Sequence, residues 1–367
     1  MAPRNPSTVA IDQWAGVDQF NDAQSLPPAS WPDALNVVVG MNGNAIALRS
    51  PANLNTALSN SKPILSGGCY DRIAGFLNVF DTQTSGTTNV TTYVTTNGAN
   101  TLVRSGQANA RWVSQNVNDR YYRLNGTEFI QITTGLNVYA NGIAKPAAAP
   151  TASMTAGTST LTVVVGVTVS YAYYNSVTTH VGECSDPSST SGAGTTQILR
   201  IGVVASTQTG VDKIVLFITE DAGSVRYLVI DSAGAPILYN NTTTNIDITA
   251  PYLLNYNVEE TVFNVPPVLG ATHISTWKSR LIQAGYVSTT MAGMAAYSGF
   301  DQISIGQPWE TWPPLNLLPI PAKSERLLGG IDTPVGWLGL SASNAFLLTG
   351  APTDKVDSGV NQIQVSE

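Results

Sequence analysis

Short runs of β-branched and aromatic residues recur along almost the whole chain, and Gly, Asn, Asp or Pro residues bound them. Residues 91–95, 121–124 and 128–132 are runs of this kind, which are typical of β-strands. No window of a dozen residues has the apolar spacing of an amphipathic helix without an interrupting Gly or Pro. The pattern therefore predicts an almost all-β protein.

Strand-and-turn units follow one another through residues 64–145, with turn signals such as Asn97-Gly98 between them. This arrangement predicts a meander of antiparallel strands, which is the material of propeller blades and barrels. Further upstream, residues 35–49 contain two apolar runs around an Asn-Gly-Asn turn and are predicted to form a hairpin.

A stretch rich in Pro and Ala at residues 142–151 has the composition of a linker and predicts a domain boundary. Residues 161–165 and 167–174 then begin a series of apolar strands at roughly the 8–16-residue spacing of β-sandwiches. We predict a propeller-like antiparallel meander with an inserted β-sandwich of fibronectin or immunoglobulin type. The N-terminal hairpin and first propeller-like half would occupy residues 1–148, the β-sandwich residues 149–260, and the second propeller-like half residues 261–367. Outside the sandwich, the remaining length is enough for roughly five or six blades.

The composition predicts a surface with few charges. Of the 367 residues, 43% are hydrophobic and only 11% are charged, against about 25% in a typical protein. A disordered chain would show high charge and few apolar residues. A surface with so few charges has little self-repulsion, which favours a chain that is covered by its neighbours in an assembly. The alternative is a secreted or cell-surface β-protein.

The net charge is −7, and the sequence pI is about 4.8. A protein that holds nucleic acid needs a basic face to neutralise phosphates, so this balance argues against specific DNA binding. An acidic wall would instead repel phosphate and let DNA slide past without sticking.

The first residues of the chain, 1–6, contain no apolar segment, so we expect no secretory signal and synthesis in the cytosol. Cys69 and Cys184 are far apart in sequence and are predicted to be two thiols rather than a disulfide framework. Without a secretory signal, we interpret Asn-x-Thr glycosylation patterns such as Asn89-Val-Thr, Asn125-Gly-Thr and Asn241-Thr-Thr as chance matches in a Thr-rich chain.

The order of these features resembles the β-propeller proteins, of nozzle or tail-tube type, in the tails of short-tailed bacteriophages. Residues 16–37 are similar to the opening strand and turn of that family, and residues 139–150 to its exit into an inserted module. Residues 169–188 resemble the fibronectin-like inserts of such proteins, with later strands at residues 214–247. Residues 277–350 resemble the return to propeller blades.

The resemblance implies a structural virion protein of a bacteriophage tail, made in the cytoplasm of the host bacterium. It implies a cyclic homo-oligomer around an axial channel that retains and ejects the genome. Its partners would be copies of itself, adjacent tail or head–tail adaptor proteins, and DNA that passes through the channel without specific binding. No cofactor is implied. We expect acidic residues to face the lumen of the ring.

The sequence offers little catalytic chemistry. His180 and His273 are each isolated, without a Cys or His partner at zinc-like spacing, so structural roles are expected. No nucleophile elbow or phosphate-binding loop is present. We therefore predict a protein that is not an enzyme and that binds no metal.

Two pairs of adjacent carboxylates bear on the alternative of an enzyme acting on surface polysaccharide: Glu220-Asp221 and Glu259-Glu260. Glycoside hydrolysis needs two carboxyl groups roughly 5–10 Å apart across a cleft. Adjacent residues on a strand point to opposite faces, so neither pair makes that geometry alone.

Four tryptophans are candidate interface or packing residues: Trp14, Trp31, Trp309 and Trp312. The last two lie in a run with three prolines and have two interpretations. They could fill the space between blades or subunits, which we favour. They could also stack on sugar rings. The second interpretation belongs to an alternative function, a carbohydrate-binding adhesin or receptor-binding protein of the virion, and predicts an exposed aromatic platform.

Overall fold

The computed structural model describes residues 64–83, 88–94, 100–108, 110–190, 194–261, 264–299, 307–320, 325–349 and 361–365, together with four short strands before residue 48. The prediction of an all-β protein is confirmed. Among the described residues, the helical elements are two 3-10 turns, η1 (Pro308–Glu310) and η2 (Pro314–Asn316). The chain divides into two compact units, one comprising residues 1–57 and 96–99 and the other the remainder.

The first unit contains two small sheets. Strand β1 (Gly16–Val17) pairs in parallel with β2 (Ser30–Trp31), and β3 (Val37–Val39) pairs in antiparallel fashion with β4 (Ala45–Ala47). The second pair is the hairpin that the sequence predicts at residues 35–49.

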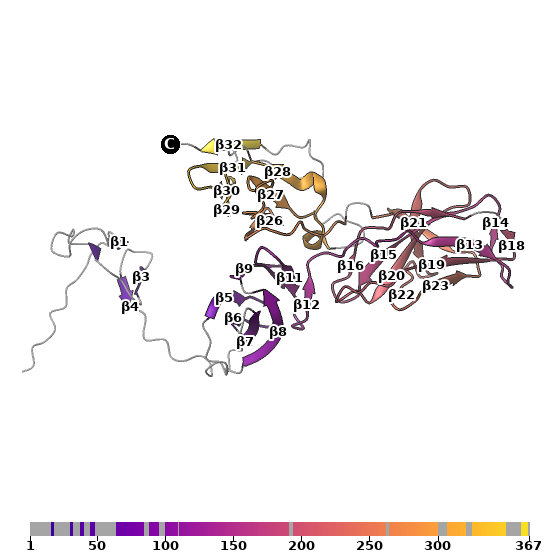
Figure 1. Ribbon diagram of the computed structural model, residues 1–367, viewed down its shortest axis with the longest axis horizontal. Coiled ribbons are helices and arrows are strands. Elements are labelled where there is room, and N and C mark those ends of the chain that lie inside the picture. Colours follow the sequence, from indigo (N-terminus) through magenta and orange to yellow (C-terminus); the bar gives the residue numbers. More distant parts are fainter. Residues whose placement is uncertain are drawn as a thin grey trace, which may run out of the picture. The chain divides into compact units, whose positions relative to one another are not determined.

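The second unit contains four antiparallel sheets of four strands each, called here the first to fourth meander sheets (Figure 1). In each sheet the strands pair in chain order, which is the arrangement of a propeller blade. The first comprises β5 (Ile64–Tyr70), β6 (Leu77–Gln83), β7 (Thr88–Val94) and β8 (Asn100–Ala108), and the second β9 (Val113–Val117), β10 (Arg120–Leu124), β11 (Phe129–Ile132) and β12 (Val138–Ala140). The third comprises β25 (His273–Trp277), β26 (Arg280–Ala284), β27 (Met294–Tyr297) and β28 (Leu317–Pro319), and the fourth β29 (Gly329–Thr333), β30 (Gly336–Leu340), β31 (Ala345–Thr349) and β32 (Asn361–Val365).

Tight turns join the first two strands of the second and third meander sheets. Asn118 and Asp119 link β9 to β10, and Lys278 and Ser279 link β25 to β26; all four residues have positive φ angles. Two-residue hairpin turns with positive φ at both positions match the twist of the flanking strands. The first strands of the sheets also approach one another, since β9 contacts β5 and β25, and β25 contacts β29. The sheets therefore form a propeller-like body.

The β-sandwich lies between the second and third meander sheets in the chain, and its strands run from Thr151 to Glu259. One sheet consists of β13 (Thr151–Thr155), β19 (Ile198–Gly202) and β23 (Asn245–Ile248). The other consists of β16 (His180–Val181), β15 (Thr168–Asn175), β20 (Lys213–Thr219), β21 (Arg226–Ile230) and β24 (Leu253–Glu259), with β17 (Ser188–Ser189) and β22 (Tyr239–Asn240) beside it; β14 (Thr162–Val163) pairs with β18 (Gly194–Thr195). The inserted sandwich is thus confirmed, whereas the three-part division at residues 148 and 260 stays a prediction.

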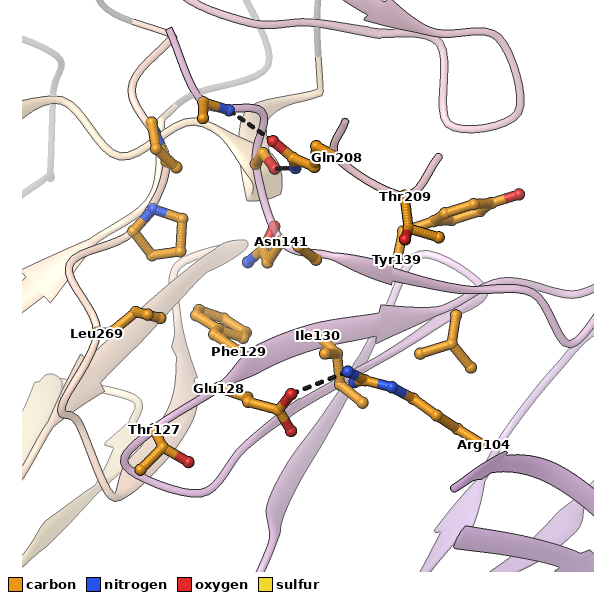
Figure 2. A pocket seen from close by; sticks show the side chains of 16 residues that line it. Arg104, Thr127, Glu128, Phe129, Ile130, Tyr139, Asn141, Gln208, Thr209 and Leu269 are labelled. Carbon is orange, nitrogen blue, oxygen red and sulfur yellow. Dashed lines mark hydrogen bonds and ion pairs between the residues drawn. The ribbon is translucent and has the colours of Figure 1, made fainter. Parts of the chain in front are cut away.

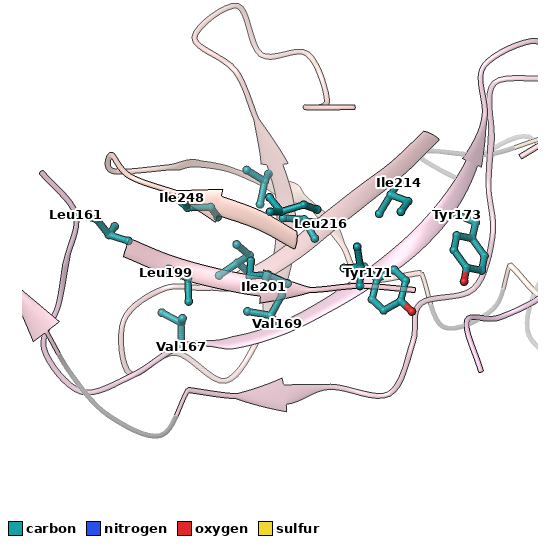
Figure 3. Close-up of a cluster of buried hydrophobic side chains, with 14 of the residues drawn as sticks. Leu161, Val167, Val169, Tyr171, Tyr173, Leu199, Ile201, Ile214, Leu216 and Ile248 are labelled. Atoms are coloured by element: carbon teal, nitrogen blue, oxygen red, sulfur yellow. The ribbon is translucent and has the colours of Figure 1, made fainter. Parts of the chain in front are cut away.

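A continuous apolar core fills the space between the two sandwich sheets (Figure 3). Val169 and Tyr171 on β15 and Leu216 on β20 pack against Leu199 and Ile201 on β19. Alternate residues of β15 and β20 point the other way into a smaller apolar cluster, so this sheet is buried on both faces. Burial on both faces explains why residues 214–218 of β20 form an unbroken apolar run.

The passage from the second meander sheet into the sandwich depends on Gly142, whose φ angle is +77°. A Cβ atom at this position would lie 2.7 Å from the Cα of Pro266 and 2.9 Å from the carbonyl oxygen of Glu310. The outgoing connector therefore packs tightly against the returning one, and only glycine fits there.

Both cysteines are free thiols, as the sequence predicts. Cys69 is exposed, while Cys184 is buried in the smaller sandwich cluster. Burial raises the pKa of the Cys184 thiol to about 12, so it remains protonated.

Candidate functional site

The predicted aromatic pair packs inside the fold. Trp312 is only 4% exposed, and its ring meets that of Phe129 edge to face at 5.5 Å. Trp309 is half-buried and donates a hydrogen bond from Nε1 to the carbonyl oxygen of Ser279 at 3.0 Å. A buried Trp312 cannot stack on a sugar ring, so the two residues do not form the exposed platform that the adhesin alternative predicts. Trp14 lies outside the described residues, and Trp31 lies on β2, where its side chain is outside the description.

A buried polar network adjoins Trp309. Glu310 is 1% exposed, and its Oε1 accepts a hydrogen bond from Arg120 Nη1 at 2.7 Å. Arg120 also donates to the side chain of Gln131 and to the carbonyl oxygen of Thr178. Because Arg120 lies on β10, Thr178 in the β15–β16 turn and Glu310 in η1, one guanidinium group connects the second meander sheet, the sandwich and the segment before β28.

Burial dominates the electrostatics of this network. Desolvation raises the pKa of Glu310 to about 7, and the Arg120 guanidinium opposes that shift without cancelling it. Desolvation lowers the pKa of the neighbouring His180 to about 3, so its imidazole stays neutral. Its Nδ1 accepts the backbone N–H of Gln307 at 3.0 Å. The network therefore holds a titratable acid and a neutral base at a junction of three segments.

The remaining candidate groups make structural contacts. His273 accepts the backbone N–H of Gly330 at 3.0 Å and so links the third and fourth meander sheets. Asp221 accepts three consecutive backbone N–H groups, those of residues 164–166, which lowers the pKa of its carboxyl group. Glu260 pairs with Arg226. Within the part of the chain that the structure describes, no group of three or more His, Cys, Asp or Glu residues is arranged to hold a metal ion.

A pocket of about 430 Å³ lies beside the connector that contains Gly142 (Figure 2). One part of its wall comes from the meander sheets: strand β8, the β10–β11 turn, and strands β11 and β12. The rest comes from the connector after β12, from a loop of the sandwich, and from the segment after residue 265. The lining residues are Arg104, Thr127, Glu128, Phe129, Ile130, Val138, Tyr139, Ala140, Asn141, Gly142, Ala144, Gln208, Thr209, Pro266, Pro267 and Leu269. We call it the Asn141 pocket.

Hydrogen bonds within the wall fix part of the Asn141 pocket and leave another part unsatisfied. Gln208 accepts the backbone N–H of Ala144 at 3.0 Å and donates to the carbonyl oxygen of Gly142 at 2.8 Å. Arg104 Nη2 pairs with Glu128 Oε1 at 2.8 Å (Figure 2). Asn141 is 3% exposed, yet neither its amide nitrogen nor its amide oxygen has a hydrogen-bond partner.

Sequence reasoning missed both the polar network and the Asn141 pocket. Arg120 and Glu310 are 190 residues apart, and no local pattern connects them. Asn141 stands before Gly142, and an Asn-Gly pair signals a turn rather than a binding group. The residues of each site are therefore brought together only by the tertiary structure, and no local sequence pattern identifies them.

Among the described residues, no helix is long and apolar enough to span a membrane. No protein-family model matches the chain, and no curated protein matches its sequence.

Proposed function

We propose that this chain is a structural protein of a bacteriophage tail, of nozzle or tube type, which assembles with copies of itself around an axial channel. The observation that carries the proposal is the architecture: four blade-like meander sheets, divided two and two by an inserted β-sandwich. That is the arrangement that the resemblance to tail proteins of short-tailed phages implies. Adjacent tail or head–tail adaptor proteins would contact the ring at its two ends.

The contacts of the reactive side chains favour a mechanical role. Both histidines accept backbone N–H groups, and Asp221, Glu260 and Glu310 are engaged in hydrogen bonds or ion pairs that hold segments together. A mechanical role needs rigid elements and defined junctions rather than a reactive group.

The charged residues of the described chain are unevenly distributed. Residues 151–261, which contain the sandwich, carry nine Asp or Glu and only three Lys or Arg. The other described residues from 64 onward carry seven acidic and nine basic residues. A wall that is acidic repels phosphate, so DNA would pass without specific binding. The acidic excess thus lies in the sandwich, whereas the described residues of the propeller-like body, which we expect to line the channel, include more basic than acidic residues.

The alternative, a carbohydrate-binding adhesin or receptor-binding protein of the virion, loses its predicted support around Trp309 and Trp312, because Trp312 is buried.

Native mass spectrometry of the full chain tests the proposal. A closed ring requires one defined oligomer in which every copy makes the same head-to-tail contact. We expect a single stoichiometry that survives dilution. A chain that remains monomeric at its highest soluble concentration would contradict self-assembly into a ring.

A further inference from the structure

We propose that the Asn141 pocket binds a neutral saccharide of one or two sugar rings. The observation behind this is the buried amide of Asn141, whose donor and acceptor both lack partners while its side chain is directed into the pocket (Figure 2). The inference does not rest on the tail proposal, because every wall residue belongs to a single chain and the pocket is complete in a monomer.

The amide of Asn141 requires an explanation. More than about 90% of buried polar groups in proteins have a hydrogen-bond partner, and leaving one unsatisfied costs stability. Asn141 leaves two atoms unsatisfied in one side chain. Folded proteins retain such a cost where function requires it, since binding residues are commonly poor choices for stability. A ligand that supplies both an acceptor and a donor would form hydrogen bonds with both the nitrogen and the oxygen of the amide.

The other polar groups of the Asn141 pocket indicate a neutral ligand. Arg104 and Glu128 compensate each other, so the wall has no net charge from this pair. Each partner nevertheless keeps one buried atom without a partner, Nη1 on Arg104 and Oε2 on Glu128. The wall therefore presents unpaired donors and unpaired acceptors together. Hydroxyl groups satisfy both kinds, because each can donate and accept, and two neighbouring hydroxyls match the two ends of an amide.

The apolar part of the wall suits the carbon face of a sugar ring. Phe129, Pro266 and Leu269 lie among the polar groups of the pocket. A mixture of apolar surface and a few fixed polar groups is typical of small-molecule sites, as is a volume within roughly 300–1,000 Å³. The Asn141 pocket, at about 430 Å³, is within this range. The two hydrogen bonds of Gln208 hold the connector and the sandwich loop together, so that side of the pocket is preformed.

The test uses the full chain with a defined panel of probes: glucose, galactose, N-acetylglucosamine, maltose and lactose, with glucuronic acid as a charged comparison. Saturation-transfer NMR detects binding, and isothermal titration calorimetry measures affinity. We expect at least one neutral probe to bind with a dissociation constant of about 1 mM, as is reasonable for so small a ligand. Glucuronic acid should bind more weakly than the neutral probe, because its carboxylate would lose hydration in a pocket where the Arg104–Glu128 pair leaves no net positive charge.

Asn141→Leu is the decisive variant, because it keeps the approximate volume of the side chain and removes both amide atoms. We expect at least a tenfold loss of affinity. We also expect a melting temperature that is unchanged or higher, since the amide has no partner in the fold. A merely structural asparagine would show the opposite result, with lower stability.

Asn116→Leu is the matched control. Asn116 lies on β9, lines no part of the Asn141 pocket, and makes two hydrogen bonds, to the carbonyl oxygen of Cys69 at 2.8 Å and from the backbone N–H of Asp71 at 3.2 Å. This variant should lower the melting temperature and leave saccharide affinity unchanged.

A second variant keeps the proposal testable if Asn141→Leu does not fold. Leu269 is 56% exposed, so Leu269→Trp would occupy the pocket without disturbing a core and should abolish binding. The proposal is overturned if no neutral probe binds at about 10 mM, far above the expected dissociation constant. It is equally overturned if binding persists in Asn141→Leu and Leu269→Trp, or if Asn141→Leu lowers stability as Asn116→Leu does.

Discussion

The β-sandwich and the meander sheets use their charged residues in opposite ways. In the sandwich, the space between the sheets is filled by one apolar core, and ion pairs such as Arg200–Asp247 lie at the surface. In the meander sheets, charged side chains are buried between neighbouring sheets. Arg123 on β10 is 1% exposed and pairs with the fully buried Asp81 on β6, across the boundary between the second and first sheets.

The difference follows from what each sheet must contact. The two sandwich sheets face each other and bury one wide surface, which apolar side chains fill without directional bonds. The second and third meander sheets each contact two neighbouring sheets. Apolar contacts alone do not fix which neighbour each sheet meets. A buried ion pair such as Arg123–Asp81 is directional and joins two particular strands, β10 of the second sheet and β6 of the first.

The largest effect is expected from breaking the pair between the first two meander sheets. Arg123→Met leaves the carboxylate of Asp81 buried without its cation, which typically costs about 3–5 kcal/mol of unfolding free energy. Chemical denaturation measures the loss. Asp81→Asn with Arg123→Met should recover part of it, because the buried charge is then removed. A loss no larger than that of an exposed pair would contradict the comparison.

A smaller effect is expected from a cavity in the sandwich core. Leu216 is fully buried, and Leu216→Ala should lower the unfolding free energy by about 3 kcal/mol. Leu340→Ala on β30 is the control, since Leu340 is 44% exposed and its truncation should change little. If the sandwich folds as its own unit, thermal unfolding of Leu216→Ala shows an earlier transition for the sandwich, while the meander sheets unfold as in the wild type.

The polar network predicts two opposite pH dependences. The pKa of Glu310 rises from 4.5 in the unfolded chain to about 7 in the fold, so its contribution to stability is full below pH 4.5 and is lost as the pH rises through 7. The pKa of His180 falls from 6.5 to about 3, so its contribution is full above pH 6.5 and is lost as the pH falls towards 3.

Single variants separate the contribution of Glu310 to the pH dependence of stability from that of His180. In Glu310→Gln, the free energy of unfolding should rise with pH between about 4 and 6.5, because only His180 still titrates. In His180→Gln, it should fall with pH between about 4.5 and 7, because only Glu310 still titrates. Urea denaturation across this range measures both slopes. Equal slopes in the two variants would show that these groups do not titrate as their burial implies.

The smallest effect is expected at the sandwich surface. Arg200 forms two hydrogen bonds of 2.7 Å to Asp247, but both side chains are more than a third exposed. Solvent and salt screen such a pair. Arg200→Met should therefore leave the denaturation midpoint unchanged, in contrast to Arg123→Met. A large shift would show that the sandwich also depends on directional charge pairs.

Individual strands and hairpins could be predicted because the residue pattern that indicates them is local in the sequence. The apolar run at residues 167–174 corresponds to β15, and the hairpin at 35–49 to β3 and β4. Trp312 could not be placed from its Pro-rich surroundings, because its burial depends on Phe129, which is far away in sequence. Asn141 and Glu310 are equally ordinary in sequence. Their environments are created by segments that meet only in the fold.

Image reconstruction of the assembled full chain by electron microscopy would show whether the chain forms a ring around a channel. We expect a closed ring of identical copies with an axial channel, and a channel wall in which acidic residues outnumber Lys and Arg. An open or irregular assembly, or a channel lined mainly by Lys and Arg, would contradict this expectation.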